Sequence, residues 1–332
     1  MSLLELRGVT VRFRQYGAGA RELVAVNSVD FAIGEHEMLG LVGESGCGKT
    51  TLGRAILRLV PLAAGEVRWR GARIDRLGQR AFRPLRGELQ YVFQDPHACL
   101  DPRMTLLESV AEPLRGLDPG TDALDRARRA QERLDEVGIA ADLAARYPHQ
   151  LSGGQLQRAV IARALVVDPR FVVCDEPVSA LDVSVQGQIV SLLERIRDER
   201  GLASLFISHN LAVVARLCRR VMVMYRGRIV ETAERRAIVE TPLHPYTREL
   251  LDAVPGIDAG ARGRLLRRAA RARPAVDDST PAAACAYAAR CPHVLPRCRV
   301  ERPALQPAGE SRLVACHRAG EWPGGLPPLA SV

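Results

Sequence analysis

The sequence predicts an α/β protein in which helices cover a mainly parallel sheet. Two observations support this prediction: short apolar runs of strand length alternate with amphipathic segments, and from about residue 96 to residue 167 only the helical period is seen. With 332 residues, 47% of them hydrophobic, the chain has enough material for one large core or two ordinary ones. We therefore expect a mainly parallel sheet interrupted by one helical insertion.

The elements are expected in the following order. The first strands are expected at Leu3–Phe13, Val24–Ile33 and Met38–Val42. A helix at Thr51–Leu59 and a further strand at Gln90–Phe93 follow. A glycine-containing loop joins the first two strands, and we also expect an antiparallel β subdomain. In the insertion, an apolar stripe at helical spacing ends before Gly138; its residues are Ala123, Leu124, Ala127, Ala130, Leu134 and Val137. Strands and helices then alternate at Phe171–Cys174, Val185–Glu199, Ser204–Ile207 and Leu211–Leu217.

Composition changes toward the C-terminus, where prolines, arginines and cysteines accumulate after Thr241. We expect one domain over residues 1–255, with a helical subdomain at about 96–167, and a small cysteine-rich appendage over residues 256–332. An arginine run at 262–273 has two readings, a solvated linker helix, which we favour, or a site for anionic lipid head groups.

The net charge of +9 would suit nucleic acid or an anionic membrane surface as partner. Because nearly all the basic residues are arginine rather than lysine, the composition resembles a genome-wide coding bias. We therefore give the net charge little weight as evidence for a partner. No run approaches the roughly 18 apolar residues of a transmembrane helix, and the N-terminus lacks a signal-peptide pattern. We expect a cytoplasmic or peripheral protein.

Lys49 is the single lysine among 47 lysines and arginines, and it lies in Gly43-Glu-Ser-Gly-Cys-Gly-Lys-Thr50. A slim ammonium fits within a close turn of backbone, whereas a guanidinium is a wide planar fork. The segment matches G-x-x-x-x-G-K-[ST], the phosphate-binding P-loop, whose Ser/Thr hydroxyl ligates Mg²⁺. A strand precedes it and a helix follows, which is the geometry of an anion site. The expected nucleotide ligands are Gly43, Ser45, Gly46, Cys47, Gly48, Lys49, Thr50 and Thr51.

Further motifs follow along the chain. Leu151-Ser-Gly-Gly-Gln155 stands before an amphipathic segment, and an apolar strand ends at Asp175 and Glu176. This is the Walker B arrangement, in which Asp175 would hold Mg²⁺ and Glu176 would orient an attacking water. Ser179–Asp182 comes directly after it. Three motif residues have simpler explanations when each is taken alone. Gln94 could be a polar residue at a strand end, Asp182 a helix cap and His209 a surface histidine.

These motifs, in this order and over nearly the whole chain, resemble the nucleotide-binding subunit of ATP-binding cassette (ABC) transporters. The resemblance implies ATP and Mg²⁺ binding, with Asp175 and Gln94 as further ligands, and catalysis by Glu176, His209, Gln94 and Lys49. It also implies a facing subunit whose ATP site this chain completes in trans through Ser152, Gly153, Gly154, Gln155 and Asp182. An aromatic residue upstream of the P-loop commonly stacks on adenine; we choose Phe13 by spacing, then Tyr16.

Several stretches resemble the ATPases of oligopeptide, dipeptide and nickel importers, and in particular the second of their two ATPases: Tyr91-Val-Phe-Gln-Asp-Pro, Leu100-Asp-Pro-Arg-Met-Thr, Asp175-Glu-Pro-Val-Ser-Ala-Leu-Asp, Val223-Met-Tyr-Arg-Gly-Arg and His244-Pro-Tyr-Thr. The resemblance implies two membrane-spanning permease subunits, a second related ATPase (or a homodimer) and an extracytoplasmic substrate-binding protein. The chain would then lie at the cytoplasmic face of the cell membrane. Three departures from the family pattern remove no nucleotide ligand: Asn210, Cys99 and Leu156.

Two other functions stay open at this point. The first is the ATPase of a nickel or metal-chelate importer. The second is a nucleic-acid-directed ABC ATPase, against which stand a single cassette, the lack of a long coiled-coil insertion and an aromatic content of 4%. We therefore expect peptide import and no nucleic acid partner.

Four of the eight cysteines lie within 32 residues, at Cys285, Cys291, Cys298 and Cys316. Ligation of one ion or cluster by four thiolates would stabilise a segment with little apolar material. Zinc commonly takes paired ligands at C-x₂₋₄-C, which are missing, so the spacing favours a four-iron–four-sulfur (4Fe–4S) cluster. Peptide-importer ATPases with a similar tail bind such a cluster. Zn²⁺ is the alternative, for which His293 and His317 are the alternative ligands; disulfides are disfavoured in a reducing cytosol.

Overall fold

The computed structural model describes residues 2–14, 22–253, 281, 283–322 and 324–326. These residues form two compact units. The first comprises residues 1–11, 30–38 and 50–208, and the second comprises residues 12–29, 39–49 and 209–332, each as far as it is described. The predicted domain boundary at 255/256 and the arginine run at 262–273 lie outside the described residues.

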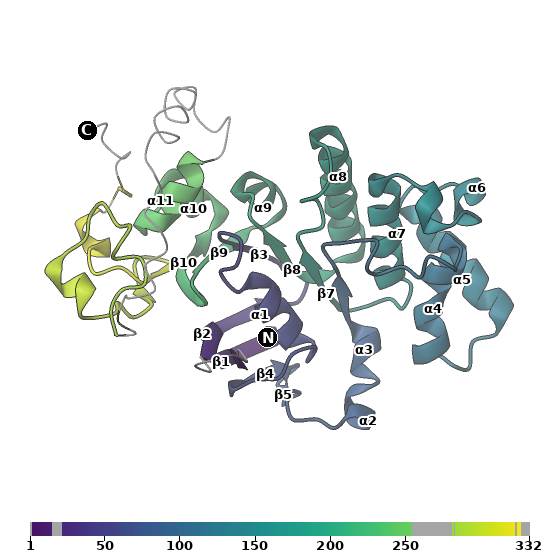
Figure 1. Ribbon diagram of the computed structural model, residues 1–332, viewed down its shortest axis with the longest axis horizontal. Helices are drawn as coiled ribbons and strands as arrows, with labels where there is room; N and C mark the ends of the chain where they lie inside the picture. Colours follow the sequence, from purple (N-terminus) through teal and green to yellow (C-terminus); the bar gives the residue numbers. More distant parts are fainter. Residues whose placement is uncertain (1, 15–21, 254–280, 282, 323, 327–332) are drawn as a thin grey trace. The chain divides into compact units, whose positions relative to one another are not determined.

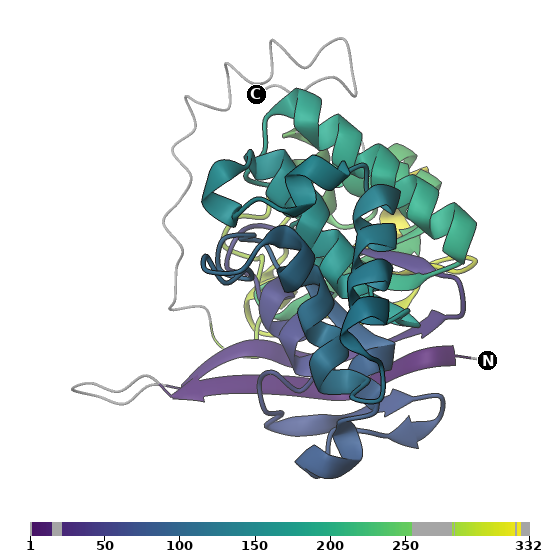
Figure 2. The same ribbon diagram turned by 90° about the vertical axis from the view of Figure 1, so that its right-hand side faces the viewer.

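The first unit contains the predicted helical insertion. Helices α4 (Leu106–Leu117), α5 (Ala123–Glu136) and α7 (Gly153–Leu165) pack against one another and lie side by side in both views (Figures 1 and 2). Thr105 and Asp122 begin α4 and α5 as N-caps, each accepting a backbone N–H of the first turn. The short α6 (Ala141–Ala144) and the 3₁₀ turn η1 (Pro148–Gln150) complete the insertion.

The apolar stripe of α5 is only partly buried. Ala130, Leu134 and Val137 are buried as expected, but the prediction was wrong for the first turn, where Leu124 is 83% exposed. The period of three and four marks one face of a helix. It does not fix how much of the helix length a neighbouring element covers, which is why the first turn was misjudged.

One group of strands lies wholly within the first unit. Strands β6 (Leu89–Val92), β7 (Phe171–Asp175) and β8 (Ala203–Ser208) pair in parallel, and every residue of β7 and β8 is buried. Parallel strands covered on both faces carry such continuous apolar runs. Helix α8 (Val183–Arg200) connects β7 to β8 and ends at Gly201, whose φ of 58° is the left-handed C-cap conformation.

An N-terminal sheet has the strand order β2-β1-β4-β5. The pairs β1–β4 and β4–β5 are antiparallel, and Leu4 lies opposite Trp69. This is an antiparallel subdomain, of which only the first two strands were predicted. The strands of this sheet are β1 (Ser2–Arg14), β2 (Glu22–Gly34), β4 (Ala64–Trp69) and β5 (Ala72–Arg73). The helices in the same part of the sequence are α1 (Lys49–Ile56), α2 (Gln79–Phe82) and α3 (Leu85–Glu88).

The second unit is built on β3 (Met38–Val42), which pairs in parallel with β9 (Arg220–Tyr225). A tight hairpin with positive φ at Arg226 and Gly227 returns the chain as β10 (Arg228–Glu234). The remaining helices and turns are α9 (Leu211–Leu217), α10 (Arg235–Glu240), α11 (Pro245–Asp252), η2 (Pro296–Arg299) and η3 (Ala319–Glu321).

The described C-terminal segment is attached to this same unit. Strand β12 (Leu313–Val314) pairs with β10, and β11 (Gln306–Pro307) pairs with β12. Arg312 Nη2 donates to Glu231 Oε1 at 2.5 Å, and Glu231 is fully buried. The prediction of a cysteine-rich appendage is thus not confirmed. Within the described residues, no helix combines the length and the apolar character needed to cross a membrane.

Candidate functional site

The P-loop joins β3 to α1 and folds around its own lysine. Lys49 Nζ donates to the carbonyl oxygens of Gly43 at 2.8 Å and Glu44 at 2.9 Å, and the residue is only 4% exposed. Gly48 has φ +108°, and a Cβ there would lie 2.2 Å from the Ala25 carbonyl oxygen, so only glycine fits. The lysine side chain and the loop backbone are therefore held in one defined arrangement.

Thr50, the residue after Lys49, belongs to the first unit, as do its hydrogen-bond partners. Thr50 Oγ1 donates to Asp175 Oδ1 at 3.0 Å, and the Tyr91 hydroxyl donates to Asp175 Oδ2 at 2.7 Å. Asp175 is 1% exposed. Burial raises the pKa of Asp175, against the hydrogen bonds from Tyr91 and Thr50, which lower it. A hydroxyl and a carboxylate side by side are the oxygen donors that Mg²⁺ prefers, so Thr50 and Asp175 fit the predicted magnesium ligands.

Glu176 directly follows the buried end of β7. It is half-buried and has φ +45°, a backbone conformation that costs about 1–3 kcal/mol for a non-glycine residue and concentrates at functional sites. Its N–H donates to the Ile207 carbonyl at 3.0 Å, and its carbonyl accepts from Ser179 Oγ at 3.1 Å. Gln94 Nε2 in turn donates to Ser179 Oγ at 3.4 Å. The structure thus brings Glu176, Ser179 and Gln94 together.

The Leu151–Gln155 segment begins α7 with a reciprocal cap. Ser152 Oγ accepts from the Gln155 N–H at 3.4 Å, and Gln155 Oε1 accepts from the Ser152 N–H at 2.9 Å. Gly154 lies against α8, since a Cβ there would meet Val185 Cγ1 at 2.6 Å. Asp182 occupies the N-cap position of α8 without a side-chain capping hydrogen bond, so the simple helix-cap explanation does not account for it.

The remaining predicted residues belong to the second unit. His209 is exposed and follows β8 directly, and Asn210 caps α9 by accepting from the Ala212 N–H at 3.0 Å. Phe13, on β1, is 38% exposed, and Tyr16 lies outside the described residues. Gly43–Lys49 also belongs to this unit, whereas Thr50, Gln94, Asp175, Glu176 and Ser152–Gln155 belong to the first.

Sequence reasoning missed two tyrosines of the site. Tyr91 was read only as part of a strand and a family-like stretch, yet its hydroxyl orients Asp175. Tyr246, fully buried in α11, accepts the N–H of the P-loop residue Glu44 at 2.7 Å. Pairing of β6 beside β7 would have indicated Tyr91, but no local sequence signal links Tyr246 to a loop 202 residues away.

The four clustered cysteines line one cavity of about 20 Å³, together with His244, His293 and His317. Burial raises the pKa of Cys291 to about 12 and of Cys316 to about 11. Among the described residues, no group of three or more histidine, cysteine or acidic side chains is arranged to hold a metal ion. The cysteines gather, but the predicted iron–sulfur or zinc ligation is not supported by this geometry.

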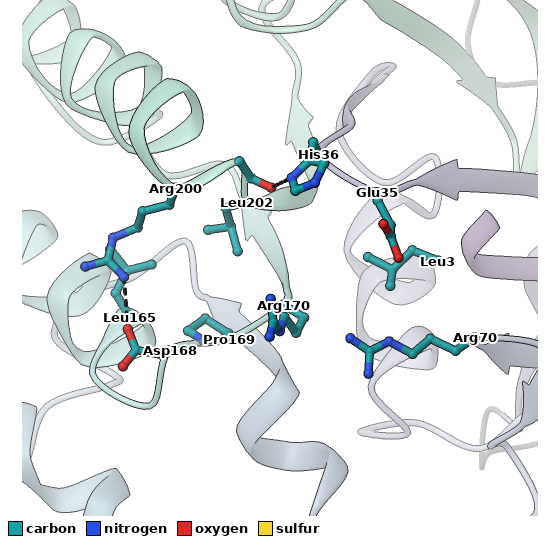
Figure 3. A pocket seen from close by; sticks show the side chains of 11 residues that line it. Leu3, Glu35, His36, Arg70, Leu165, Asp168, Pro169, Arg170, Arg200 and Leu202 are labelled. Atoms are coloured by element: carbon teal, nitrogen blue, oxygen red, sulfur yellow. Dashed lines mark hydrogen bonds and ion pairs between the residues drawn. The ribbon is translucent and has the colours of Figure 1, made fainter. Parts of the chain in front are cut away.

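A second cavity, of about 430 Å³, lies wholly within the first unit (Figure 3). Arg70 and Glu35 extend from one side of it, and Pro169 and Leu202 line the other. None of its lining residues belongs to a predicted site. This cavity therefore does not coincide with the residues that the sequence motifs single out.

Comparisons with known proteins agree with the motifs. Residues 26–179 match the family "ABC transporter", and residues 230–298 match "Oligopeptide/dipeptide transporter, C-terminal region". The putative oligopeptide transport ATP-binding protein YkfD of Bacillus subtilis is 42% identical over 321 residues, which cover 96% of this chain and 95% of that protein. A putative peptide import ATP-binding protein of Brucella ovis, BOV_A0347, is 44% identical over 317 residues, covering 95% and 98%.

Two further matches extend this comparison. The glutathione import ATP-binding protein GsiA of Salmonella choleraesuis is 50% identical over 262 residues, which are 77% of this chain and 42% of that protein. Among solved structures, the dimeric post-hydrolysis state of the ATP-binding cassette MJ0796, bound to ADP and Pi, superposes on this chain with a TM-score of 0.64 at 30% sequence identity. The aligned region is 70% of this chain and 99% of the MJ0796 chain.

Proposed function

This chain belongs to the ABC transporter family and is an ATP-hydrolysing subunit of it, and from that premise we propose that it powers the import of peptides through a membrane transporter. The observation that carries the proposal is the match of residues 230–298 to the C-terminal region of oligopeptide/dipeptide transporters. The relatives named for oligopeptide, peptide and glutathione import support the same substrate class.

In the proposed site, the P-loop N–H groups and Lys49 bind the phosphates of ATP, and Thr50 and Asp175 ligate Mg²⁺. Lys49 would exchange its bonds to the Gly43 and Glu44 carbonyls for bonds to phosphate oxygens. Bound Mg²⁺ neutralises charge on the phosphates. Glu176 accepts a proton from the attacking water, while Gln94 and His209 position that water and the γ-phosphate.

The proposal includes a facing ATPase subunit. Ser152, Gly153, Gly154, Gln155 and Asp182 would complete the ATP site of that subunit, since Ser152 and Asp182 are exposed at helix starts where N–H groups favour anions. The dimeric state of the MJ0796 cassette supports such a pair. We propose a second related ATPase as the partner, with a homodimer as the alternative, and Phe13 as the residue that stacks on adenine.

The other proposed partners are two membrane-spanning permease subunits and an extracytoplasmic substrate-binding protein. The chain would sit peripherally at the cytoplasmic face of the membrane. The test is ATP hydrolysis by the complete complex in lipid vesicles, with di- and oligopeptides, glutathione or nickel chelates offered to the binding protein. Stimulation by peptides supports the proposal. Stimulation by nickel chelates alone, or by DNA without any membrane complex, would replace it.

We also propose that Cys285, Cys291, Cys298 and Cys316 hold a 4Fe–4S cluster. Support comes from the donor set, because the four thiols line one cavity and thiolates are the ligands that such a cluster takes. Protein purified without oxygen should be brown, absorb near ~400 nm and contain about four iron atoms per chain. Cys298→Ser should lose the iron, whereas Cys218→Ser, a buried cysteine of the second unit, should keep it. Colourless protein with one zinc would refute the cluster.

A further inference from the structure

A two-pronged ion pair joins the C-terminal segment to the P-loop. Arg290 Nη1 donates to Glu44 Oε2 and Nη2 donates to Glu44 Oε1, both at 2.9 Å. The two side chains are 14% and 30% exposed, so water screens the pair only partly. A bidentate arginine–carboxylate pair is among the stronger and most directional interactions in proteins. Glu44 is the second residue of the P-loop, and its partner lies 246 positions further along the chain.

Glu44 is held at three of its groups. Its side chain binds Arg290, its N–H donates to the Tyr246 hydroxyl at 2.7 Å, and its carbonyl accepts from Lys49 Nζ at 2.9 Å. The carboxylate gripped by Arg290 and the carbonyl that holds the lysine ammonium thus belong to one residue. Any rotation of Glu44 about its backbone changes both, and with them the direction of the P-loop N–H groups.

Arg290 is itself firmly fixed. Nη2 also donates to Glu249 Oε1 at 2.7 Å, and Glu249 Oε2 accepts from the Tyr287 hydroxyl at 2.5 Å. The guanidinium carbon lies 5.8 Å from the ring centre of Tyr287 and 5.9 Å from that of Tyr225, within cation–π range. Both rings are nearly buried and contact each other edge to face. Arg290 is therefore a rigid support, unlike an exposed arginine on a flexible stem.

Attachment of the C-terminal segment does not depend on this pair alone. Strand β12 pairs with β10, and Arg312 binds the buried Glu231. Both arginines anchor the segment, but only Arg290 contacts the P-loop. We infer that Arg290 is a positioning residue for nucleotide binding, which fixes Glu44 so that the loop keeps the conformation that receives the phosphates. This inference rests on the proposed ATP site and adds that the C-terminal segment sets the affinity of that site.

The test measures ADP binding to the full chain by calorimetry, since ADP occupies the loop without being hydrolysed. Arg290→Ala should raise the Kd for ADP about tenfold. The Kd of Arg290→Lys should lie between those of wild type and Arg290→Ala, because an ammonium cannot form the bidentate pair with both carboxylate oxygens. In the reconstituted complex, the KM for ATP should rise while kcat stays within about twofold of wild type. Glu44→Gln alters the other residue of the pair and should likewise raise the KM for ATP with little change in kcat. It is the substitute test if Arg290→Ala does not fold.

Arg312→Ala is the matched control, because it loosens the same segment without touching the P-loop. It should lower the melting temperature but leave the Kd for ADP near that of wild type. If Arg312→Ala and Arg290→Ala raise the Kd equally, or if Arg290→Ala and Glu44→Gln leave it unchanged, the inference is overturned. A wild-type chain that binds no ADP would instead overturn the proposed site itself, so the two failures are distinguishable.

Discussion

Thr50 and Asp175, 125 residues apart in sequence, share a 3.0 Å hydrogen bond between the Thr50 hydroxyl and Asp175 Oδ1. The other oxygen of Asp175 accepts from Tyr91. Hydroxyl groups from α1 and β6 therefore fix the orientation of this buried carboxylate. Thr50 and Asp175 are the proposed magnesium ligands, and these hydrogen bonds fix the direction of the Asp175 oxygens.

Tyr91→Phe should weaken the magnesium site. Loss of the hydroxyl removes the hydrogen bond that lowers the pKa of Asp175, so the buried carboxylate becomes harder to ionise and less precisely oriented. We expect the Mg²⁺ concentration for half-maximal ATPase activity to rise about three- to tenfold, with the maximal rate nearly restored at saturating Mg²⁺. Tyr147→Phe, at a tyrosine that is 40% exposed, should leave the Mg²⁺ requirement unchanged. Equal Mg²⁺ curves for both variants would contradict the role of Tyr91.

Glu176→Gln should bind ATP but hydrolyse it about 10²–10⁴-fold more slowly, which corresponds to a barrier increase of roughly 3–5 kcal/mol. The amide keeps the shape of the side chain but cannot accept the proton of the attacking water. We also expect an ATP-bound closed pair to accumulate, measurable by size-exclusion chromatography. Glu199→Gln, at an exposed acid on α8, is the control. Full activity of Glu176→Gln in the complete complex would show that another group is the base.

Lys49→Arg should abolish most ATP turnover although it conserves the charge. The lysine is 4% exposed and bonded to two loop carbonyls, a space shaped for an ammonium and too narrow for a planar guanidinium. Turnover and the melting temperature should be measured together, so that a folding defect is recognised. A folded variant with most of its activity would mean that the single lysine has no functional significance.

The stability of the chain should depend on the protonation of His244. Its Nδ1 accepts from the Tyr246 N–H at 3.1 Å, and burial lowers its pKa from an ordinary value near 6.5 to about 3. Between these two values the unfolded chain binds a proton that the folded chain excludes. The free energy of unfolding should therefore fall as the pH falls from about 6.5 toward 3, by at most about 1.4 kcal/mol per pH unit for this one site.

His244→Asn offers the comparison for this effect. Asparagine retains an N-cap acceptor at the start of α11 but has no proton to gain in this range. The slope of the unfolding free energy against pH measures how many more protons the unfolded chain binds than the folded chain. In urea titrations between pH 4 and pH 7, this number should be smaller by about one in the variant. Identical slopes in the two proteins would show that His244 is protonated, or solvated, in the folded state.

The sequence predicted β3, β6, β7 and β8 and the helical segments that follow them, because continuous apolar runs and helical spacing are local signals. It missed β9 and β10, whose hairpin depends on positive φ at Arg226 and Gly227, and β4 and β5, which are short and partly exposed. The failure at Leu124 has the same origin. Burial is decided by neighbours in space, which a one-dimensional period does not contain.

The site was predictable to a similar degree. Lys49, Thr50, Asp175 and Glu176 follow from motifs in which spacing fixes geometry. The residues that support them, Tyr91, Tyr246 and Arg290, come from other elements and carry no local signature. The four cysteines do line one cavity, as their clustering in the sequence indicates, but their spacing does not determine whether the four thiols can bind one ion.

The single lysine also makes this chain a convenient subject for chemical footprinting. A lysine-specific protease has one bond to cut, Lys49–Thr50, at the first turn of α1, and an amine-directed label has one lysine side chain to modify. Because that side chain is buried in the folded loop, either reagent reports opening of the nucleotide site with no background from lysines elsewhere. A substitution that frees Glu44 should therefore be detectable as faster cleavage at one place in an otherwise intact chain.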